Sequence, residues 1–192
     1  MIVYYWPMRK VILGFGMTID GYIARRDHSV DYLVMDKEAG KIMAEFWAGI
    51  DTTIMGRKTA EATGKMQKDA EMPEIGGVKN YVFSRKWKAG PRKGYAVVNQ
   101  SPAAFLKRLR KTPGKDIFLM GGGELGRSFL RADLVDELYL GLVPILLGAG
   151  RPGFPAGFPQ RDFKLIEFKP YSSGVTLRYE RVRTKVKSKK AR

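Results

Sequence analysis

Short runs of consecutive apolar residues recur along the first two thirds of the chain. The clearest are VIL at 11–13 with Phe15, TTIM at 52–55, YVF at 81–83, YAVV at 95–98 and IFLM at 117–120. Unbroken rather than alternating hydrophobicity is typical of strands covered on both faces. We therefore predict a mainly parallel sheet with helices on either side.

Two amphipathic segments lie between these runs. Apolar positions 42, 43, 46 and 47 follow helical spacing, and Asp36 before them is a candidate N-cap. A second stripe, at 104–106 and 109, follows Ser101 and Pro102, which suit the cap and the first helical position. Strands that alternate with helices predict an α/β fold.

The end of the chain has a different pattern. Val175, Leu177 and Tyr179 alternate with polar residues, as in a half-exposed strand. The segment 163–169 precedes them, and PYSSG at 170–174 is a turn sequence, so we expect a C-terminal antiparallel hairpin. No repeat or domain boundary interrupts the pattern, and we predict one domain over residues 8–183.

Composition excludes several classes of protein. The chain has 192 residues, no cysteine and one histidine, so disulfides, thiolate catalysis and multi-histidine metal sites are ruled out and no metal is expected. His28 is interpreted as a solvated turn residue. No apolar run reaches the ~20 residues of a membrane span, and the start does not resemble a signal peptide. We therefore expect a cytoplasmic protein, with residues 1–7 an extension before Met8.

The formal net charge of +16 is unevenly distributed. The last twelve residues, RVRTKVKSKKAR, contain seven Lys or Arg and no acid, and we predict a basic, disordered tail over 184–192. Nucleic-acid binding by this tail is an alternative, although it has no aromatic residue for base stacking. The positive balance of the remaining chain equally suits a small anionic ligand.

Three loops follow predicted strands and carry groups that suit anions. The first is Gly56, Arg57, Lys58 and Thr59, where a helix is expected to begin and its N–H groups and dipole favour negative charge. The second is Ser84 and Arg85, a hydroxyl beside a guanidinium. The third is Gly121, Gly122 and Gly123 before a helical stretch from Glu124 and Leu125 onward. Each alone also suits an ordinary turn, but in a parallel sheet all three would lie at one edge.

The order of these motifs resembles the dihydrofolate-reductase-like superfamily, and most closely the reductase domain of the riboflavin-biosynthesis deaminase-reductase. The resemblance spans residues 8–182 and rests on five segments: VILGFGMTIDGYIA (11–24), TIMGRKTAE (53–61), YVFSR (81–85), IFLMGGGELGRSFL (117–130) and LVDELYLGLVPILLGAGRPGF (134–154). It implies a three-layer fold, with a central mixed, mostly parallel sheet flanked by helices, and NADPH-dependent reduction of a heterocyclic substrate. Dimerisation is common in this family, and a homodimer is expected.

The resemblance also implies roles for the loops. The first two would take the adenosine 2′-phosphate of NADPH, and the glycine-rich turn, with Glu124 and Leu125, would receive the pyrophosphate. The segment 17–21 would close over the nicotinamide, which makes Thr18 and Asp20 candidate substrate contacts and Asp20 the candidate proton donor. Asp-Gly is also a favoured turn pair, so Asp20 has a structural alternative.

The physiological substrate stays open at this stage. Phe154 either borders the substrate or packs against a second subunit. Met120 stands where riboflavin-pathway reductases commonly have an acid, and no carboxylate among Asp31, Asp36 and Glu38 matches the folate-binding position. The candidates are reduction of 5-amino-6-(5-phosphoribosylamino)uracil, a dihydrofolate or pteridine reductase activity, and NADPH binding without catalysis.

Overall fold

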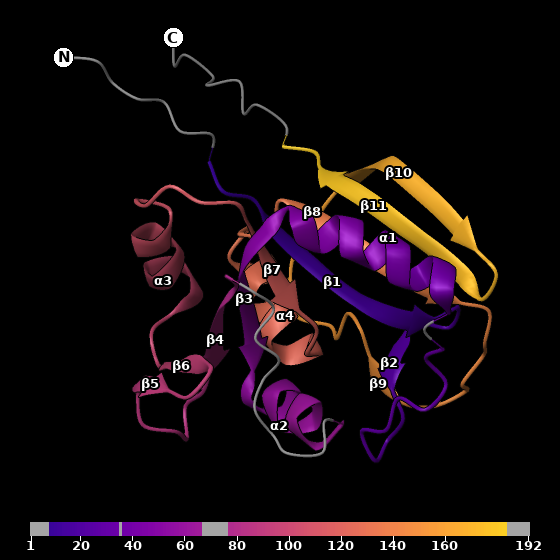
Figure 1. The fold of residues 1–192 in the computed structure, drawn as a ribbon, viewed down its shortest axis with the longest axis horizontal. Helices are drawn as coiled ribbons and strands as arrows, with labels where there is room; N and C mark the ends of the chain where they lie inside the picture. Colours follow the sequence, from indigo (N-terminus) through magenta and orange to yellow (C-terminus); the bar gives the residue numbers. More distant parts are fainter. Residues whose placement is uncertain (1–7, 35, 67–76, 184–192) are drawn as a thin grey trace, which may run out of the picture.

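A single nine-stranded sheet forms the centre of the molecule in a computed structural model that describes residues 8–34, 36–66 and 77–183 (Figure 1). The strand order is β10-β11-β8-β1-β7-β3-β4-β6-β5. The strands are β1 (Val11–Thr18), β3 (Ile50–Gly56), β4 (Lys79–Phe83), β5 (Gly90–Arg92), β6 (Tyr95–Val98), β7 (Asp116–Met120), β8 (Glu137–Val143), β10 (Phe163–Tyr171) and β11 (Gly174–Arg181). The six strands from β8 to β6 run parallel, while β5, β10 and β11 are joined by antiparallel pairing.

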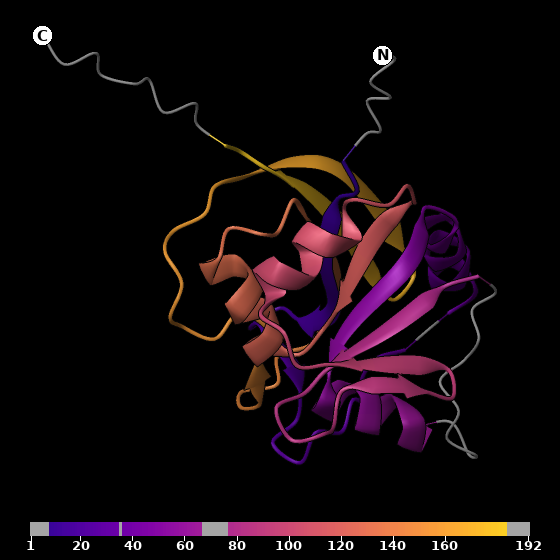
Figure 2. The same cartoon turned by 90° about the vertical axis from the view of Figure 1, so that its left-hand side faces the viewer.

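Four helices cover the two faces of this sheet. They are α1 (Lys37–Ala48), α2 (Arg57–Met66), α3 (Pro102–Leu109) and α4 (Gly123–Arg131). Figure 2 shows α1 and α2 on one side of the sheet and α3 and α4 on the other. The predicted α/β fold, with a mostly parallel central sheet, flanking helices and a C-terminal hairpin, is confirmed.

The predicted strands lie at the centre of the hydrophobic core. Val11, Leu13, Ile54, Ile117 and Leu119 are fully buried, and they pack with residues of α3 and α4 in the largest apolar cluster. Burying side chains of this size stabilises the fold by about 1.5–3 kcal/mol each. This burial on both faces explains why these runs show no polar alternation.

Both predicted helix caps are present. The carboxylate of Asp36 accepts hydrogen bonds from the N–H groups of Glu38 (3.0 Å) and Ala39 (2.8 Å). Ser101 accepts one from Ala104 at 3.3 Å, and Pro102 is the first residue of α3. The apolar stripe of α1 packs on β1, β7 and β8 through Phe46, which stacks on Tyr139 at 4.2 Å between ring centroids.

The glycine- and proline-rich segment after β8 is part of the packed fold. Its strand β9 (Arg151–Pro152) pairs with β2 (Tyr22–Ala24) in a separate two-stranded sheet. Gly153 lies so close to Phe15 that an added Cβ would be 2.7 Å from the ring. The segment therefore cannot act as a free linker.

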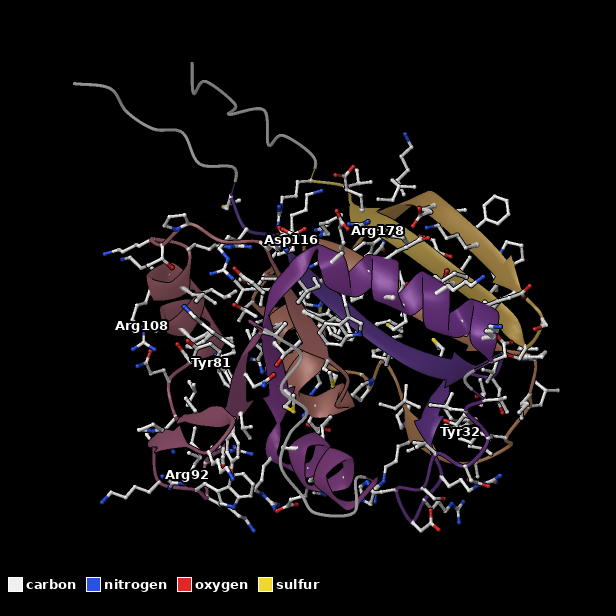
Figure 3. The ribbon with its side chains drawn as sticks, in the orientation of Figure 1. Tyr32, Tyr81, Arg92, Arg108, Asp116 and Arg178 are labelled. Atoms are coloured by element: carbon white, nitrogen blue, oxygen red, sulfur yellow. The ribbon has the colours of Figure 1, made fainter. Side chains whose placement is uncertain are left out.

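Ion pairs join the strands at the end of the sheet where β7 begins. Glu137, which is fully buried, accepts hydrogen bonds from Lys10 and Arg178, both at 2.6 Å. Asp136 accepts one from Arg110 at 2.5 Å. Figure 3 shows Asp116 and Arg178 at this end of the molecule. These contacts give both acids of the VDEL segment structural roles in the fold.

Among the described residues, no helix is long and apolar enough to cross a membrane. The same residues contain no group of three or more His, Cys, Asp or Glu side chains placed to hold a metal ion. The expected extension at 1–7 and basic tail at 184–192 lie outside the described residues.

Candidate functional site

The three predicted anion loops lie at the carboxyl edge of the parallel strands. In the sheet register Met55 of β3 is level with Met120 of β7, and Gly56 is level with Phe83 of β4. The residues that follow these strand ends therefore leave the sheet at one level, at the lower edge in Figure 1. In open α/β sheets this edge is where ligands bind.

Contacts bring the first and third loops together. A Cβ added to Gly122 would be 3.0 Å from Oγ1 of Thr59, and one added to Gly56 would be 3.9 Å from Cβ of Leu125. The turn also touches β9, since a Cβ on Gly123 would be 2.8 Å from the carbonyl oxygen of Pro152. The amino termini of α2 and α4 thus meet at one place, which the sequence spacing alone could not show.

The backbone conformation of the turn explains why glycines occupy it. Gly121 and Gly122 have φ angles of +48° and +74°, in the region that side chains with a Cβ rarely adopt. The N–H of Gly121 donates to the carbonyl of Gly14 at 3.0 Å, which fixes the turn on β1. Gly122 is the N-cap of α4, and it supplies no side-chain hydrogen bond to the first turn. Backbone N–H groups at a helix start of this kind suit an anion.

The first turn of α2 is basic. It contains Arg57 and Lys58 and no acidic residue. Cations at a helix amino terminus oppose the helix dipole, by about 0.3–1 kcal/mol each at exposed positions, so an anionic ligand would relieve an unfavourable arrangement. Arg57 forms an ion pair with Glu61 one turn later, whereas the side chain of Lys58 is exposed.

A further basic residue, Arg151, lies in this region. Arg151 donates to the carbonyl of Arg26 at 3.2 Å, which ties β9 to the loop containing His28. Loss of hydration and the positive charges of Arg151 and Lys58 lower the pKa of His28. His28 has a φ of +74° and is exposed, as expected for a turn residue. The effect of Lys58 on His28 has no signal in the sequence, because the two residues are thirty positions apart.

Ser84 and Arg85 follow β4 on the same sheet edge. The Ser84 hydroxyl accepts hydrogen bonds from the N–H groups of Lys86 (3.1 Å) and Trp87 (2.9 Å), so its oxygen organises its own turn and only its hydrogen is left to donate to a ligand. Arg85 is exposed.

The structure places Asp20 and Thr18 inside a loop junction. Asp20 accepts hydrogen bonds from the Thr18 hydroxyl (2.5 Å), from the N–H of Leu147 (2.9 Å) and from the N–H of Gly148 (2.7 Å). The Thr18 hydroxyl and these N–H groups lower the pKa of the Asp20 carboxyl, which favours the carboxylate over the proton-donating acid. Thr18 is fully buried and accepts from the N–H of Tyr22. These contacts favour structural roles for both residues.

Phe154 packs within the chain. Its ring lies 5.2 Å from that of Phe15, and it borders the largest apolar cluster. Contacts within the chain therefore account for the burial of Phe154, without a substrate or a second subunit. Met120 is partly buried between the clusters under α1 and α2.

The acids before and within α1 also form ion pairs and hydrogen bonds within the chain. Asp31 forms a bidentate pair with Arg25, at 2.7 and 3.1 Å. Asp36 and Glu38 bind the turn between β10 and β11 through Ser172. These contacts give all three acids structural roles.

A mixed sheet of this order, with helix amino termini gathered at its carboxyl edge and a C-terminal hairpin, defines a dihydrofolate-reductase-like α/β domain. Within that class, the family model of the RibD C-terminal domain matches residues 9–177. The chain belongs to the RibD C-terminal domain family, a family of reductase domains.

Comparisons with individual proteins agree with this assignment. The chain is 33% identical to the uncharacterized protein YyaP of Bacillus subtilis, over 87% of this chain and 92% of that one. The uncharacterized protein YwjB of the same organism is 29% identical, over 90% and 98%. Among solved structures, the putative riboflavin biosynthesis protein from Shewanella sp. PV-4 superposes with a TM-score of 0.74 at 24% identity, covering 91% of this chain and 99% of that one. RibD of Acinetobacter baumannii superposes with a TM-score of 0.71 at 19% identity, covering 91% of this chain and 58% of that one. Both structures therefore show the shared fold.

Proposed function

We propose that this protein is an NADPH-dependent reductase that transfers hydride to a C=N-type carbon of a small heterocyclic substrate. The observation that carries the proposal is that the amino termini of α2 and α4 meet. A Cβ added to Gly122 at the start of α4 would be 3.0 Å from Oγ1 of Thr59 in α2. A glycine-lined, positively charged corner between two helix starts suits a diphosphate with an additional phosphate nearby.

The residues present fit this cofactor. Gly121, Gly122 and Gly123 would hold the pyrophosphate through backbone N–H groups, with Glu124 and Leu125 continuing the turn. The lack of a side-chain cap on α4 and the positive φ angles are the features expected of such a turn. NADPH would supply the hydride. The chain would bind, orient and shield the reacting groups.

The first two loops would recognise the 2′-phosphate. Gly56, Arg57, Lys58 and Thr59 open α2 without an acid in the first turn. Ser84 and Arg85 follow β4, the strand paired with β3, at the same edge. A guanidinium and an ammonium are suited to phosphate in different ways, as a fork and as a point charge. This arrangement favours NADPH over NADH.

The best candidate substrate is 5-amino-6-(5-phosphoribosylamino)uracil or a close relative. A protein of the same fold, the diaminohydroxyphosphoribosylaminopyrimidine deaminase/5-amino-6-(5-phosphoribosylamino)uracil reductase of Thermotoga maritima, superposes with a TM-score of 0.68 at 16% identity. Dihydropteridines are the alternative ring system, with Thr18, Asp20 and Phe154 near the substrate in either case.

NADPH binding without catalysis is a second candidate function. It is favoured by one observation, the engagement of the Asp20 carboxylate by three donors within the fold. Tight NADPH binding with no oxidation by ribosylaminopyrimidines or dihydropteridines would select this candidate.

The deciding experiment titrates NADPH and NADH against wild type, Arg57→Ala, Lys58→Ala and a matched control, Lys111→Ala. Lys111 is an exposed cation just after α3, near the amino-end of the strands. Wild type and the control should prefer NADPH. Loss of one charge-assisted contact should cost about 1.5–3 kcal/mol, or roughly tenfold to a hundredfold in NADPH affinity.

Lys58→Ala should show the larger loss, because Arg57 is shared with Glu61. NADH affinity should change little in any variant. Equal affinity of wild type for both cofactors would overturn the phosphate site, and equal losses in Lys58→Ala and Lys111→Ala would assign the effect to overall charge.

A further inference from the structure

The segment from residue 77 to residue 115 contains no acidic side chain. It carries eleven Lys or Arg and neither Asp nor Glu. The whole chain has 19 acids in 192 residues, so about four would be expected in a stretch of this length. The segment forms β4, β5, β6 and α3. These elements lie together on the left of Figure 1, and Figure 2 turns that side toward the viewer. A positive stretch of sequence therefore becomes one side of the folded molecule.

Four exposed cations from two parts of this segment form what we call the basic face. Lys88 and Arg92 come from the start and the end of the β5 region, and Lys107 and Arg108 come from α3. Figure 3 shows Arg92 and Arg108 on the same side of the molecule. Arg85 belongs to the candidate cofactor site and is not included. The basic face thus consists of residues that the proposed NADPH site does not use.

Uncharged groups hold the two guanidinium groups of the basic face in place. Arg92 donates to the carbonyl oxygens of Pro91 at 3.0 Å and of Lys88 at 3.3 Å. The guanidinium carbon of Arg108 lies 5.6 Å from the ring centroid of Phe105. A carbonyl oxygen or an aromatic ring positions an arginine without cancelling its charge. Both arginines are therefore positioned in advance for an anionic partner, which lowers the entropic cost of binding.

Acids of the chain do not balance the basic face. Several exposed cations elsewhere are paired with carboxylates, as in Arg25 with Asp31, Arg127 with Glu124 and Lys169 with Glu45. Over residues 8–34, 36–66 and 77–183, none of the four side chains of the basic face forms an ion pair. Like charges gathered in this way repel one another, and an anionic partner removes that repulsion.

We propose that the basic face binds the phosphate backbone of a double-stranded nucleic acid without reading its sequence. A duplex carries one negative charge per about 1.7 Å of its axis, and release of its counterions drives binding to a cationic surface. Cations spread over a sheet edge and a neighbouring helix suit phosphates that are spread over two strands. The proposal does not depend on the proposed reductase function, and it places the contact on the folded domain and not on the C-terminal tail.

The aromatic residues beside the basic face favour a duplex over a single strand. Phe105 is buried beneath Arg108, and Trp87 packs against Tyr95 at 6.3 Å between ring centroids. Proteins that bind single strands present aromatic rings on which unpaired bases stack. In a duplex the bases stack on one another, so contacts to phosphates are sufficient for binding.

Fluorescence anisotropy with a labelled DNA duplex of about two helical turns tests the proposal. Two variants of equal net charge are compared with wild type. The face variant replaces four residues with glutamine, Lys88, Arg92, Lys107 and Arg108. The tail variant makes the same change at Lys185, Lys187, Lys189 and Lys190. Each variant removes four positive charges from +16 and leaves +12, so the comparison separates the position of the charges from their sum.

The face variant should bind the duplex with a weaker dependence on salt. Loss of four phosphate contacts should make the slope of log K against log salt concentration shallower by about 3.6, which is about a hundredfold in affinity between about 50 and about 200 mM salt. The tail variant should keep the wild-type slope to within about one unit. The two variants should have equal NADPH affinity, so the result does not depend on whether the proposed function holds.

A variant with only Lys88→Gln and Lys107→Gln leaves both arginine contacts in place and serves if the face variant does not fold. Its slope should be shallower by about 1.8. The proposal would be overturned by wild type that shows no salt-dependent binding, by a face variant with the wild-type slope, or by an equal loss in the tail variant. Equally tight binding of a single strand, or displacement of the duplex by poly-glutamate at equal charge concentration, would also overturn it.

Discussion

Individual residues at the candidate site differ in what holds them in place. Gly122 is constrained twice, by a φ of +74° and by the Thr59 hydroxyl that a Cβ would meet at 3.0 Å. Asp20, two residues after β1, is held by donors from two segments of the chain. Gly122 is therefore required by the backbone conformation of the candidate site, whereas Asp20 is required by the fold of the loops around it.

Replacing Gly122 with alanine should weaken cofactor binding. The left-handed conformation costs alanine about 1 kcal/mol or more, and the new Cβ displaces Thr59 from the α2 amino terminus. We expect about a tenfold loss of NADPH affinity in calorimetric titration. Gly77→Ala is the control, because Gly77 has a φ of +79° with no atom within 4 Å of its added Cβ. It should lose similar stability and no affinity; equal affinity losses would contradict the assignment of Gly122 to the site.

Asp20→Asn should affect stability more than catalysis. The amide keeps an acceptor for Thr18 but removes the charge that the N–H groups of Leu147 and Gly148 stabilise, so the thermal midpoint should fall. The pH profile of turnover should keep its shape. If Asp20 is the proton donor, turnover should instead drop by about 10²–10⁴ and the profile should lose its titrating limb.

At the scale of elements, the start of α1 is bound to the turn of the C-terminal hairpin. Asp36 caps the helix and also accepts hydrogen bonds from the hydroxyls of Ser172 (2.9 Å) and Ser173 (2.6 Å). The N–H of Ala39 and the Ser173 hydroxyl are the main causes that lower the pKa of Asp36 to about 2, from 3.8. One carboxylate thus joins two elements more than 130 residues apart.

This junction should weaken in acid. Because the folded-state pKa is lowered, the ionised carboxylate stabilises the fold fully above about pH 4, and the contribution is lost as the pH falls through about 2. Asp36→Asn should speed hydrogen exchange in the hairpin at neutral pH, and this difference from wild type should vanish near pH 2. Asp31→Asn, which removes an exposed pair with Arg25, should leave hairpin exchange unchanged. A difference that persists in acid would contradict the assignment.

At the scale of the whole molecule, the charge of +16 is a long-range contribution to anion binding. A nucleotide phosphate group carries up to two negative charges at neutral pH, so NADPH is attracted more strongly than NADH by the same protein. Salt screens this attraction, since the Debye length falls from about 10 Å at 0.1 M to about 3 Å at 1 M.

The preference for NADPH should therefore shrink with ionic strength. We expect NADPH affinity to fall several-fold more than NADH affinity between about 0.1 M and about 1 M salt, measured by fluorescence titration. Lys58→Ala should reduce this difference and Lys111→Ala should not. Parallel losses for both cofactors would contradict recognition of the additional phosphate by charge.

Most of the fold was predictable because its signals are local. The core strands are recognisable in the sequence as unbroken apolar runs. Asp36, Ser101 and Pro102 mark helix starts through contacts within three residues. The candidate site was predictable in part. Glycines between a strand and a helix indicate an anion turn, but the meeting of Gly122 with Thr59 depends on the order of strands in the sheet.

The sequence by itself determined the α/β class, the helix caps, the C-terminal hairpin and the membership suggested by its ordered motifs. These follow from spacing and from short-range hydrogen bonding. Only the tertiary structure decided that Asp20 serves a loop junction, that the charges of Lys58 and Arg151 act on His28, and that Leu165 and Phe168 are exposed beside a β-bulge. The physical reason is that each depends on segments distant in the chain, whose approach is set by packing of the whole sheet.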